Sequence, residues 1–261
     1  MAAGKLGKAG STTEVTTISV SLASNAVAGR TLVSACVVDW PVTYSVNTSD
    51  GWRILVQESV SSGFDGVTTV MAVLERAYGG GDRRDTCVWS WDETDTCAAV
   101  IVELDDDFSA GLQIATASAD SGGLSRSCSC GSTTARGAGT AIAVVGVSDV
   151  NNWDASGSSG PCATWSNSFA EMTGGYFHDG REDSGGGIAT KASTNSATIA
   201  TTATAADPSA TTSMAAGVIG VFGAADAATV NVYDGSRWSS APLHVYDGRS
   251  WAAAAGLTVA R

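Results

Sequence analysis

Short runs of β-branched and aliphatic residues recur along the chain, and each run is closed by Gly, Asn, Asp or Ser. In the run Val15–Leu22, the apolar side chains of Ile18, Val20 and Leu22 alternate with hydroxyl-bearing ones. Alternation with a period of two is typical of a strand with one buried and one solvated face. Similar runs predict strands at Thr31–Asp39, Trp52–Val60, Val67–Arg76, Thr86–Trp91, Ala98–Leu104, Leu112–Ala119, Thr140–Val147, Gly187–Ala192, Ala197–Ala203 and Gly217–Gly223.

These runs predict an all-β fold. The sequence shows no sustained apolar stripe of an amphipathic helix, and the spacing of the strands suits two packed antiparallel sheets. We therefore expect an antiparallel β-sandwich, jelly-roll-like, over residues 15–225, preceded by an N-terminal arm over residues 1–14. Ala141–Val147 and Gly217–Phe222 are continuously small and apolar, so they predict central strands that are covered on both faces.

Charge and hydrophobicity argue against several classes of protein. The 261 residues include 14 Lys and Arg against 26 Asp and Glu, a formal net charge of −12 without a basic cluster, which argues against nucleic-acid binding. The apolar runs are far shorter than the roughly 20 residues of a membrane helix. Met1–Ser11 has no apolar segment behind its two lysines, so we expect no secretory signal. A hydrophobic content of 44% argues against disorder.

Candidate catalytic residues are few. The two histidines, His178 and His244, are not accompanied by the spacing of a Ser/His/Asp triad. Acidic residues cluster in Asp92–Asp95 and Glu103–Asp107, but neighbours in sequence do not face each other across a groove as glycosidase carboxylates do. Phosphate-binding and dinucleotide motifs are missing from the sequence. We expect no enzymatic activity and no cofactor.

Metal sites also find little support in the sequence. The acidic stretches Asp105–Asp107 and Asp179–Asp183 offer oxygen ligands for Ca²⁺, but without the spacing of an EF-hand loop. The 6 cysteines are not arranged as the C-x₂-C pairs that bind zinc. The prediction is a protein without a metal site.

The cysteines leave disulfides open as an alternative. Cys36 lies inside an apolar run and is interpreted as a buried hydrophobic residue. Cys87 and Cys97 bracket a segment interpreted as a loop, so that they could face each other across a hairpin. Cys128-Ser-Cys130 is interpreted as part of a polar loop that Cys162 could reach. The missing export signal favours free thiols.

Six tryptophans stand at predicted strand ends or in turns, and they suggest carbohydrate binding as an alternative function. Exposed indole faces stack on sugars, whereas a large core also recruits tryptophan. Trp89 and Trp91 are two residues apart and share one face of a strand, as core residues do, so the core interpretation is favoured. The six residues are Trp40, Trp52, Trp89, Trp91, Trp153 and Trp165.

The last part of the chain, residues 226–261, contains a repeat. Val232–Trp238 and Val245–Trp251 share the pattern Val-Tyr-Asp-Gly-x-x-Trp at a spacing of 13 residues. Asp-Gly between alternating hydrophobic residues is a strong signal for a two-residue hairpin turn, and Tyr and Trp then face each other across the strands. Two hairpins bury little surface alone. We therefore expect this module to pack on the main domain, on a partner or on copies of itself.

The doubled unit resembles the hairpin repeats at the end of many minor tail proteins of tailed bacteriophages, especially those that infect actinobacteria. The matching residues are Val232, Tyr233, Asp234, Gly235, Trp238, Val245, Tyr246, Asp247, Gly248 and Trp251. The preceding region is more loosely similar to sandwich domains of such virion proteins, at Ala28–Val33, Cys97–Glu103 and Gly217–Phe222.

This resemblance implies a non-enzymatic virion structural protein that is made in the host cytoplasm and acts in assembly or surface display. The partners it implies are other virion proteins and copies of the same chain, with a host-surface glycan as an additional partner. It implies an assembly role for Tyr233, Asp234, Gly235, Trp238, Tyr246, Asp247, Gly248 and Trp251. The alternatives are a capsid decoration protein and a carbohydrate-binding adhesin module.

Overall fold

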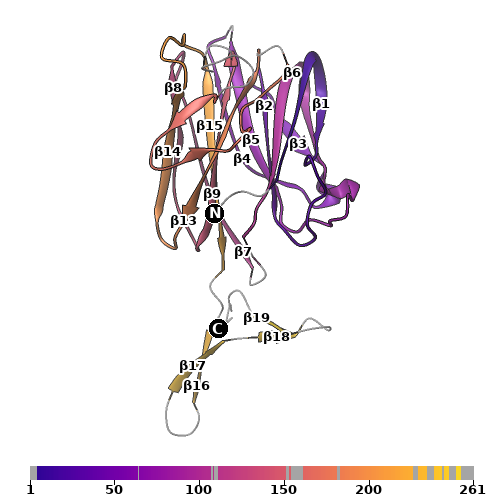
Figure 1. Ribbon diagram of the computed structural model, residues 1–261, viewed down its shortest axis with the longest axis vertical. Coiled ribbons are helices and arrows are strands. Elements are labelled where there is room, and N and C mark those ends of the chain that lie inside the picture. The colour runs from indigo at the N-terminus through magenta and orange to yellow at the C-terminus, as the bar shows by residue number, and fades with distance from the viewer. Residues whose placement is uncertain are drawn as a thin grey trace.

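The fold was analysed in a computed structural model that describes residues 5–63, 65–106, 108, 111–150, 153, 161–180 and 183–225, and the backbone of residues 229–233, 238–242, 244–246 and 251–253. The chain is nearly all β, with antiparallel sheets (Figure 1). Helical conformation among the described residues is confined to short 3₁₀ turns, including η1 (Thr48–Asp50) and η2 (Arg83–Asp85). The predicted all-β sandwich is therefore confirmed.

Residues 5–104 form the first half of the sandwich. Its strands are β1 (Leu6–Val20), β2 (Leu32–Val38), β3 (Tyr44–Val46), β4 (Arg53–Ser61), β5 (Gly66–Leu74) and β6 (Cys87–Glu103). They form one sheet in the order β1-β6-β2-β5-β4, and β3 pairs with β6.

β1 and β6 are long, bent strands. One part of each belongs to the main sheet with β2, β5 and β4, and the other part forms a covering layer with β3. The register between them shifts near Val15, and residues Cys87–Trp91 then pair with the end of β1 and with β3. This part of β6 covers the outer face of β2, where Trp89 Nε1 donates a hydrogen bond to Ser34 Oγ at 3.0 Å. The first half is thus a small sandwich with its own outer core.

Residues 111–225 form the second half. Its strands are β7 (Leu112–Asp120), β8 (Ser127–Thr134), β9 (Gly139–Val147), β10 (Ala163–Trp165), β11 (Ala170–Glu171), β12 (Phe177–His178), β13 (Gly185–Ser193), β14 (Thr198–Ala205) and β15 (Ala215–Ala224). The main sheet has the order β11-β13-β9-β15-β7, with β12 also on β13. A second sheet, β10-β14-β8, covers its outer face.

The two halves have the same topology. In the main sheet of the second half, β7, β15, β9 and β13 take the places of β1, β6, β2 and β5, and β11 with β12 takes the place of β4. The covering sheet β8-β14-β10 corresponds to the parts of β1, β6 and β3 that cover the first half. The sandwich therefore consists of two equivalent units joined in tandem.

The main sheets of the two halves pack face to face, as the darker and the orange parts of Figure 1 show. The contacts are reciprocal: β5 lies on β9 and β13 on β2, while β4 lies on β7 and β12 on β1. Exchanging the halves maps each contact onto another, which is the arrangement of a two-fold symmetric, isologous interface. The apolar cluster between these sheets is called the shared core below; its members include Val37, Val67, Leu104, Met214 and Phe222.

Close approach of the sheets requires small residues at the centre of the shared core. Thr69 Oγ1 in β5 donates a hydrogen bond across the interface to Ala216 O at 2.9 Å. Gly146 in β9 lies beneath it, where a Cβ atom would overlap Thr69 Oγ1 and crowd Val37. A side chain at this position would push the two halves apart.

The predicted central strands are confirmed. β9 and β15 lie inside the main sheet of the second half, and all residues of Ala141–Val147 and Gly217–Phe222 are buried. They need no polar face because the shared core covers one side and β8, β10 and β14 cover the other.

Some boundaries differ from the expectation. Residues 6–14, expected in an arm, belong to β1 and pair with β6 as far as Ser11. The runs Thr86–Trp91 and Ala98–Leu104 are parts of the single strand β6, because the hydroxyl and acidic residues between them continue the strand at its exposed bend. The region 15–225, expected as one sandwich, contains most of both halves.

The chain continues beyond the second half as two hairpins. β16 (Thr229–Tyr233) pairs with β17 (Trp238–Pro242), and β18 (His244–Tyr246) pairs with β19 (Trp251–Ala253). Each pair is a separate two-stranded antiparallel sheet (Figure 1).

Candidate functional site

The predicted assembly residues fall in these terminal hairpins. The register places Tyr233 opposite Trp238 and Tyr246 opposite Trp251, which confirms the predicted Tyr–Trp pairing at the level of the backbone. The expected two-residue turn is wrong, because four residues lie between the members of each pair. The turn residues Asp234, Gly235, Asp247 and Gly248 lie outside the described residues. The role of the repeat in assembly stays a prediction.

The six tryptophans considered for sugar binding, all of them described, do not form an exposed stacking surface. Trp52, Trp89, Trp91 and Trp153 are buried, and Trp40 and Trp165 are half-buried. Trp89 and Trp91 each pack edge-on against Tyr44, with ring centroids 5.8 and 5.9 Å apart. The core interpretation of the tryptophans fits this structure.

The cysteines are all buried free thiols, so the alternative of disulfides has no support here. The hairpin expected between Cys87 and Cys97 is wrong, because both lie in the single strand β6. The polar loop expected around Cys128 and Cys130 is also wrong: both are buried residues of β8, where alternation turns them inward and Ser127 and Ser129 outward. Burial raises the pKa of Cys87, Cys97 and Cys128 to about 12, which leaves them unreactive near neutral pH.

His178 is held by two contacts with neighbouring described residues. Its ring stacks on Tyr176 at 5.2 Å between centroids, and Nδ1 accepts a hydrogen bond from the Gly180 N–H at 3.0 Å. His244 begins β18, where only the backbone is described. Within the described ranges, no three His, Cys, Asp or Glu side chains are grouped closely enough to be assigned as a metal site.

Two long loops at one end of the first half form the candidate site. Residues 21–31 connect β1 to β2, and residues 75–86 connect β5 to β6. They are tied to each other by the backbone hydrogen bonds Gly29 N–H to Ala77 O at 2.8 Å and Ala77 N–H to Arg30 O at 2.7 Å. The second half has only short turns at the corresponding places, where Ala135 and Ala197 are joined in the same way at 2.9 Å.

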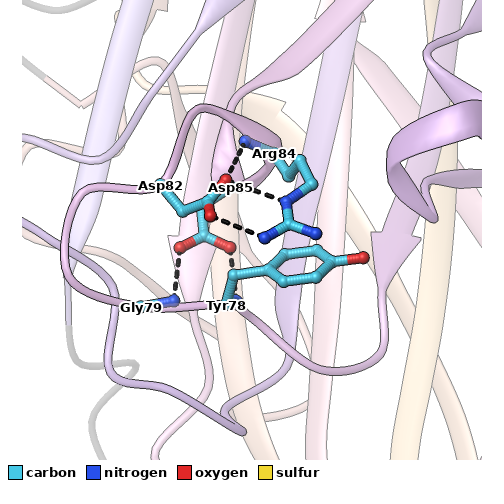
Figure 2. A network of polar contacts seen from close by, with 5 residues as sticks. All are labelled: Tyr78, Gly79, Asp82, Arg84 and Asp85. Atoms are coloured by element: carbon cyan, nitrogen blue, oxygen red, sulfur yellow. Dashed lines mark hydrogen bonds and ion pairs between the residues drawn. The ribbon is translucent and has the colours of Figure 1, made fainter.

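Asp85 organises the second of these loops (Figure 2). Its side chain is buried, and its two oxygens accept hydrogen bonds from the N–H groups of Tyr78 at 2.6 Å and Gly79 at 2.7 Å. Gly79, Gly80 and Gly81 all have positive φ, between 66° and 82°, a region that favours glycine. The Gly-Gly-Gly sequence therefore makes a tight reversal that the Asp85 carboxylate holds in place.

Asp82 and Arg84 complete the network in Figure 2. Asp82 accepts hydrogen bonds from the Arg84 backbone N–H at 2.9 Å and from its guanidinium at 2.7 and 3.0 Å. These hydrogen bonds hold the pKa of Asp82 well below its usual range. The Arg84 guanidinium also lies 3.5 Å from the centre of the Tyr78 ring, and Tyr78 remains 42% exposed.

A cavity of about 200 Å³ lies between the two loops. Its walls mix hydroxyl, amide and small apolar groups, and the hydrogen bonds above already occupy both of its carboxylates. Such a cavity is suited to binding a small neutral ligand rather than to acid–base chemistry. The lining residues are Ser21, Leu22, Ala23, Ser24, Asn25, Ala26, Gly81, Asp82, Asp85 and Thr86.

Sequence patterns did not predict a site at these loop residues. An available signal was the Asp82–Asp85 segment directly after three glycines, since Asp is a preferred residue at the start of a helical turn. Asp82 does cap η2. The sequence does not predict that this loop pairs with residues 21–31.

Comparison with protein-family models, with curated proteins and with solved structures gave no match. None of the helices among the described residues is long and apolar enough to cross a membrane.

Proposed function

We propose that this chain is a non-enzymatic structural protein of a virion, acting in assembly or surface display as a minor tail protein of a tailed bacteriophage. The observation that carries the proposal is the pair of terminal hairpins. Their strands form two-stranded sheets of their own and do not extend the sheets of the sandwich. A two-stranded hairpin has little stability alone, so such a module gains most from packing on another surface.

The sandwich is suited to a structural role. Its cysteines are packed as buried free thiols, and the Asp85 carboxylate holds a loop by hydrogen bonds. Only 15% of the residues are charged, which leaves few charged groups to desolvate when the surface is covered by neighbouring proteins.

Deletion of residues 228–261 tests this proposal. The last strand of the sandwich, β15, ends at Ala224, so the truncated chain should keep its fold and its thermal transition. Incorporation into particles of the phage that encodes the chain, measured by immunoblot of purified virions, should be lost. Leu124→Ala, at an exposed position between β7 and β8, is the control and should be incorporated normally. Normal incorporation of the folded truncation would contradict the proposal.

A capsid decoration protein is the alternative with the same fold class. Immunogold labelling separates the two roles, since a tail protein places gold on the tail and a decoration protein places it over the head. Labelling confined to the head would replace the tail assignment.

Glycan recognition is a second candidate function, favoured by the loop cavity of the first half. Val27 and Tyr78, two exposed large hydrophobic side chains, lie on its two loops, and the lining of the cavity offers hydroxyl and amide groups. A panel of neutral host-wall glycans should bind the wild-type chain, and Ala23→Phe, which fills the cavity, should abolish binding. Thr194→Ala, in the corresponding turn of the second half, should bind like wild type. Equal binding by Ala23→Phe would exclude this site.

A further inference from the structure

The first half exposes different side chains at the two ends of its strands. β2 begins at Leu32, directly after the first long loop, and ends at Val38, which pairs with Cys97 of β6. The long loops therefore lie at one end of the strands, and the bend of β6 that precedes Cys97 lies at the other. The two loops, residues 21–31 and 75–86, are called the loop end below.

Carboxylates gather at the end opposite to the loops. Asp92 and Glu93 are exposed in the bend of β6, and Glu14 is exposed in β1, where the register brings β1 beside Asp95. Burial, and then repulsion by Glu14 and Glu93, raises the pKa of Asp95, which agrees with this crowding. None of the four takes part in the ion pairs found among the described residues. They are called the acidic end below.

The loop end exposes arginine and large hydrophobic side chains. Arg76 and Arg83 are exposed, and the ion pairs found in the described part of the chain do not include them. Val27 and Tyr78, on the two loops, are 48% and 42% exposed. Both arginines lie outside the lining of the loop cavity, so a neutral ligand in that cavity would not use their charge.

The loop end is ordered by contacts of its own. The Gly29 N–H donates to Ala77 O at 2.8 Å, and the Asp85 carboxylate accepts from the Tyr78 N–H at 2.6 Å. The Arg84 guanidinium lies 3.5 Å from the centre of the Tyr78 ring (Figure 2). A surface that is ordered before binding loses less conformational entropy on binding, and Tyr and Arg are the side chains enriched in protein interfaces.

We propose that the loop end binds the acidic end of a second copy of this chain, head to tail along the strands. The two exposed arginines face the carboxylates of the other copy in this contact, and Val27 and Tyr78 are covered. Charge complementarity selects this orientation, because two acidic ends repel each other and the exposed arginines of two loop ends do the same.

This contact is heterologous, because the two copies use different surfaces. One copy keeps a free loop end and the other a free acidic end, so further copies can be added to form a ring or a filament. The contact belongs to the sandwich and does not use the terminal hairpins. The inference is therefore independent of the virion role proposed above, which is tested by incorporation into particles.

Sedimentation velocity of the full chain tests the contact. Wild type should form dimers and larger species with rising protein concentration in about 50 mM NaCl, and these should dissociate in about 500 mM NaCl, where the Debye length falls to about 4 Å. Arg83→Glu should weaken association about tenfold or more, because it places a carboxylate against the acidic end. Arg136→Glu, the same change at an exposed arginine in the short turn of the second half, is the control and should associate as wild type does. Monomeric wild type, or equal association of Arg83→Glu and wild type, would overturn the proposal.

Mixing two variants tests the head-to-tail orientation. Arg76→Glu with Arg83→Glu disables only the loop end, and Asp92→Asn with Glu93→Gln disables only the acidic end. Asn at position 92 keeps an acceptor for the Thr43 N–H, and both variants should retain the wild-type thermal transition. Each should be monomeric alone, and their equimolar mixture should form a dimer of the two variants and no larger species, because each contributes one intact surface. Association of the acidic-end variant alone at the wild-type level would assign self-association to another surface and contradict the proposal.

Discussion

The first and the second half of the sandwich place equivalent strands in the same order but differ at the ends of those strands. The first half joins β1 to β2 and β5 to β6 by long loops that enclose a cavity and the Asp85 network. The second half makes the same two connections by short turns around Ala135 and Ala197. The strands thus form a common framework, and the loops make the halves different.

Both halves contain an equivalent side-chain contact from an edge strand of the main sheet to the chain at a covering strand. Gln57 in β4 donates a hydrogen bond to Val42 O at 3.0 Å, just before β3. At the corresponding place, Glu171 in β11 accepts hydrogen bonds from Cys162 and Ala163 in front of and within β10, both at 3.2 Å. The same connection is made by a neutral amide in one half and by a titratable carboxyl in the other.

The largest expected effect comes from the equivalent shared-core residues Leu104 and Phe222. Both are fully buried at the ends of corresponding strands, so Phe222→Ala should cost about 4 kcal/mol and Leu104→Ala about 3 kcal/mol of unfolding free energy. Because both halves contribute to this core, chemical denaturation should still show one transition. Two separate transitions in either variant would show that the halves are independent units.

A smaller effect is expected from Gly146→Ala, which tests how closely the halves approach. The added methyl group would overlap Thr69 Oγ1, and we expect a loss of about 2–3 kcal/mol in urea unfolding. Gly80→Ala is the control, since its Cβ would meet open space and only the positive φ is unfavourable, a cost of about 1 kcal/mol. A cost at Gly146 no larger than that at Gly80 would mean that the interface adapts.

The loop network should contribute less than the shared core. Asp85→Ala leaves the N–H groups of Tyr78 and Gly79 without their acceptor, and a loss of about 2 kcal/mol is expected. Thr194→Ala, in the short turn of the second half, should remain within about 0.5 kcal/mol of wild type. Hydrogen exchange of the Tyr78 and Gly79 amides should become faster in Asp85→Ala; unchanged protection would show that other contacts hold this loop.

The smallest expected effect is the pH dependence of the β11 contact. Burial raises the pKa of Glu171 above its usual 4.5, against the effect of its hydrogen bonds, so the folded chain retains this proton longer than the unfolded chain. Its contribution to stability is therefore complete below about pH 4.5 and is lost as the pH rises through the folded pKa. Stability curves of wild type and Glu171→Gln should diverge over that interval, with the wild type losing stability as the pH rises. Gln57→Glu should introduce a similar slope into the first half, and parallel curves for all three would refute this assignment.

Much of the fold was predictable because alternation is a local property. The apolar run Ala141–Val147 is buried on both faces whichever strands lie beside it, and its prediction as a central strand is confirmed. The pairing of Tyr233 with Trp238 likewise depends on a short local connection, although four residues lie between this pair where a two-residue turn was expected. The bend of β6 was not predictable, because the segment between Trp91 and Cys97 is polar and continues as a strand only through its pairing with β1.

The candidate site could be predicted from the sequence less well than the fold. Gly79 in the Gly79–Gly81 turn packs closely against Ala28, so that a side chain there would overlap it. The two residues are distant in the sequence, and their contact could not be predicted from it. This grouping leaves no periodic pattern in the sequence, since its members meet only when the two loops pair with each other.

By itself, the sequence determined that this chain is built from antiparallel strands and that it ends in two repeated hairpins. Both follow from side-chain alternation and turn chemistry, which act over a few residues. Only the tertiary structure decided that the strands form two equivalent halves, that their main sheets share a core, and that Asp85 is buried between two loops of the first half. The physical reason is that burial is a property of packed surfaces: a polar residue just beyond a strand is exposed until a second sheet covers it.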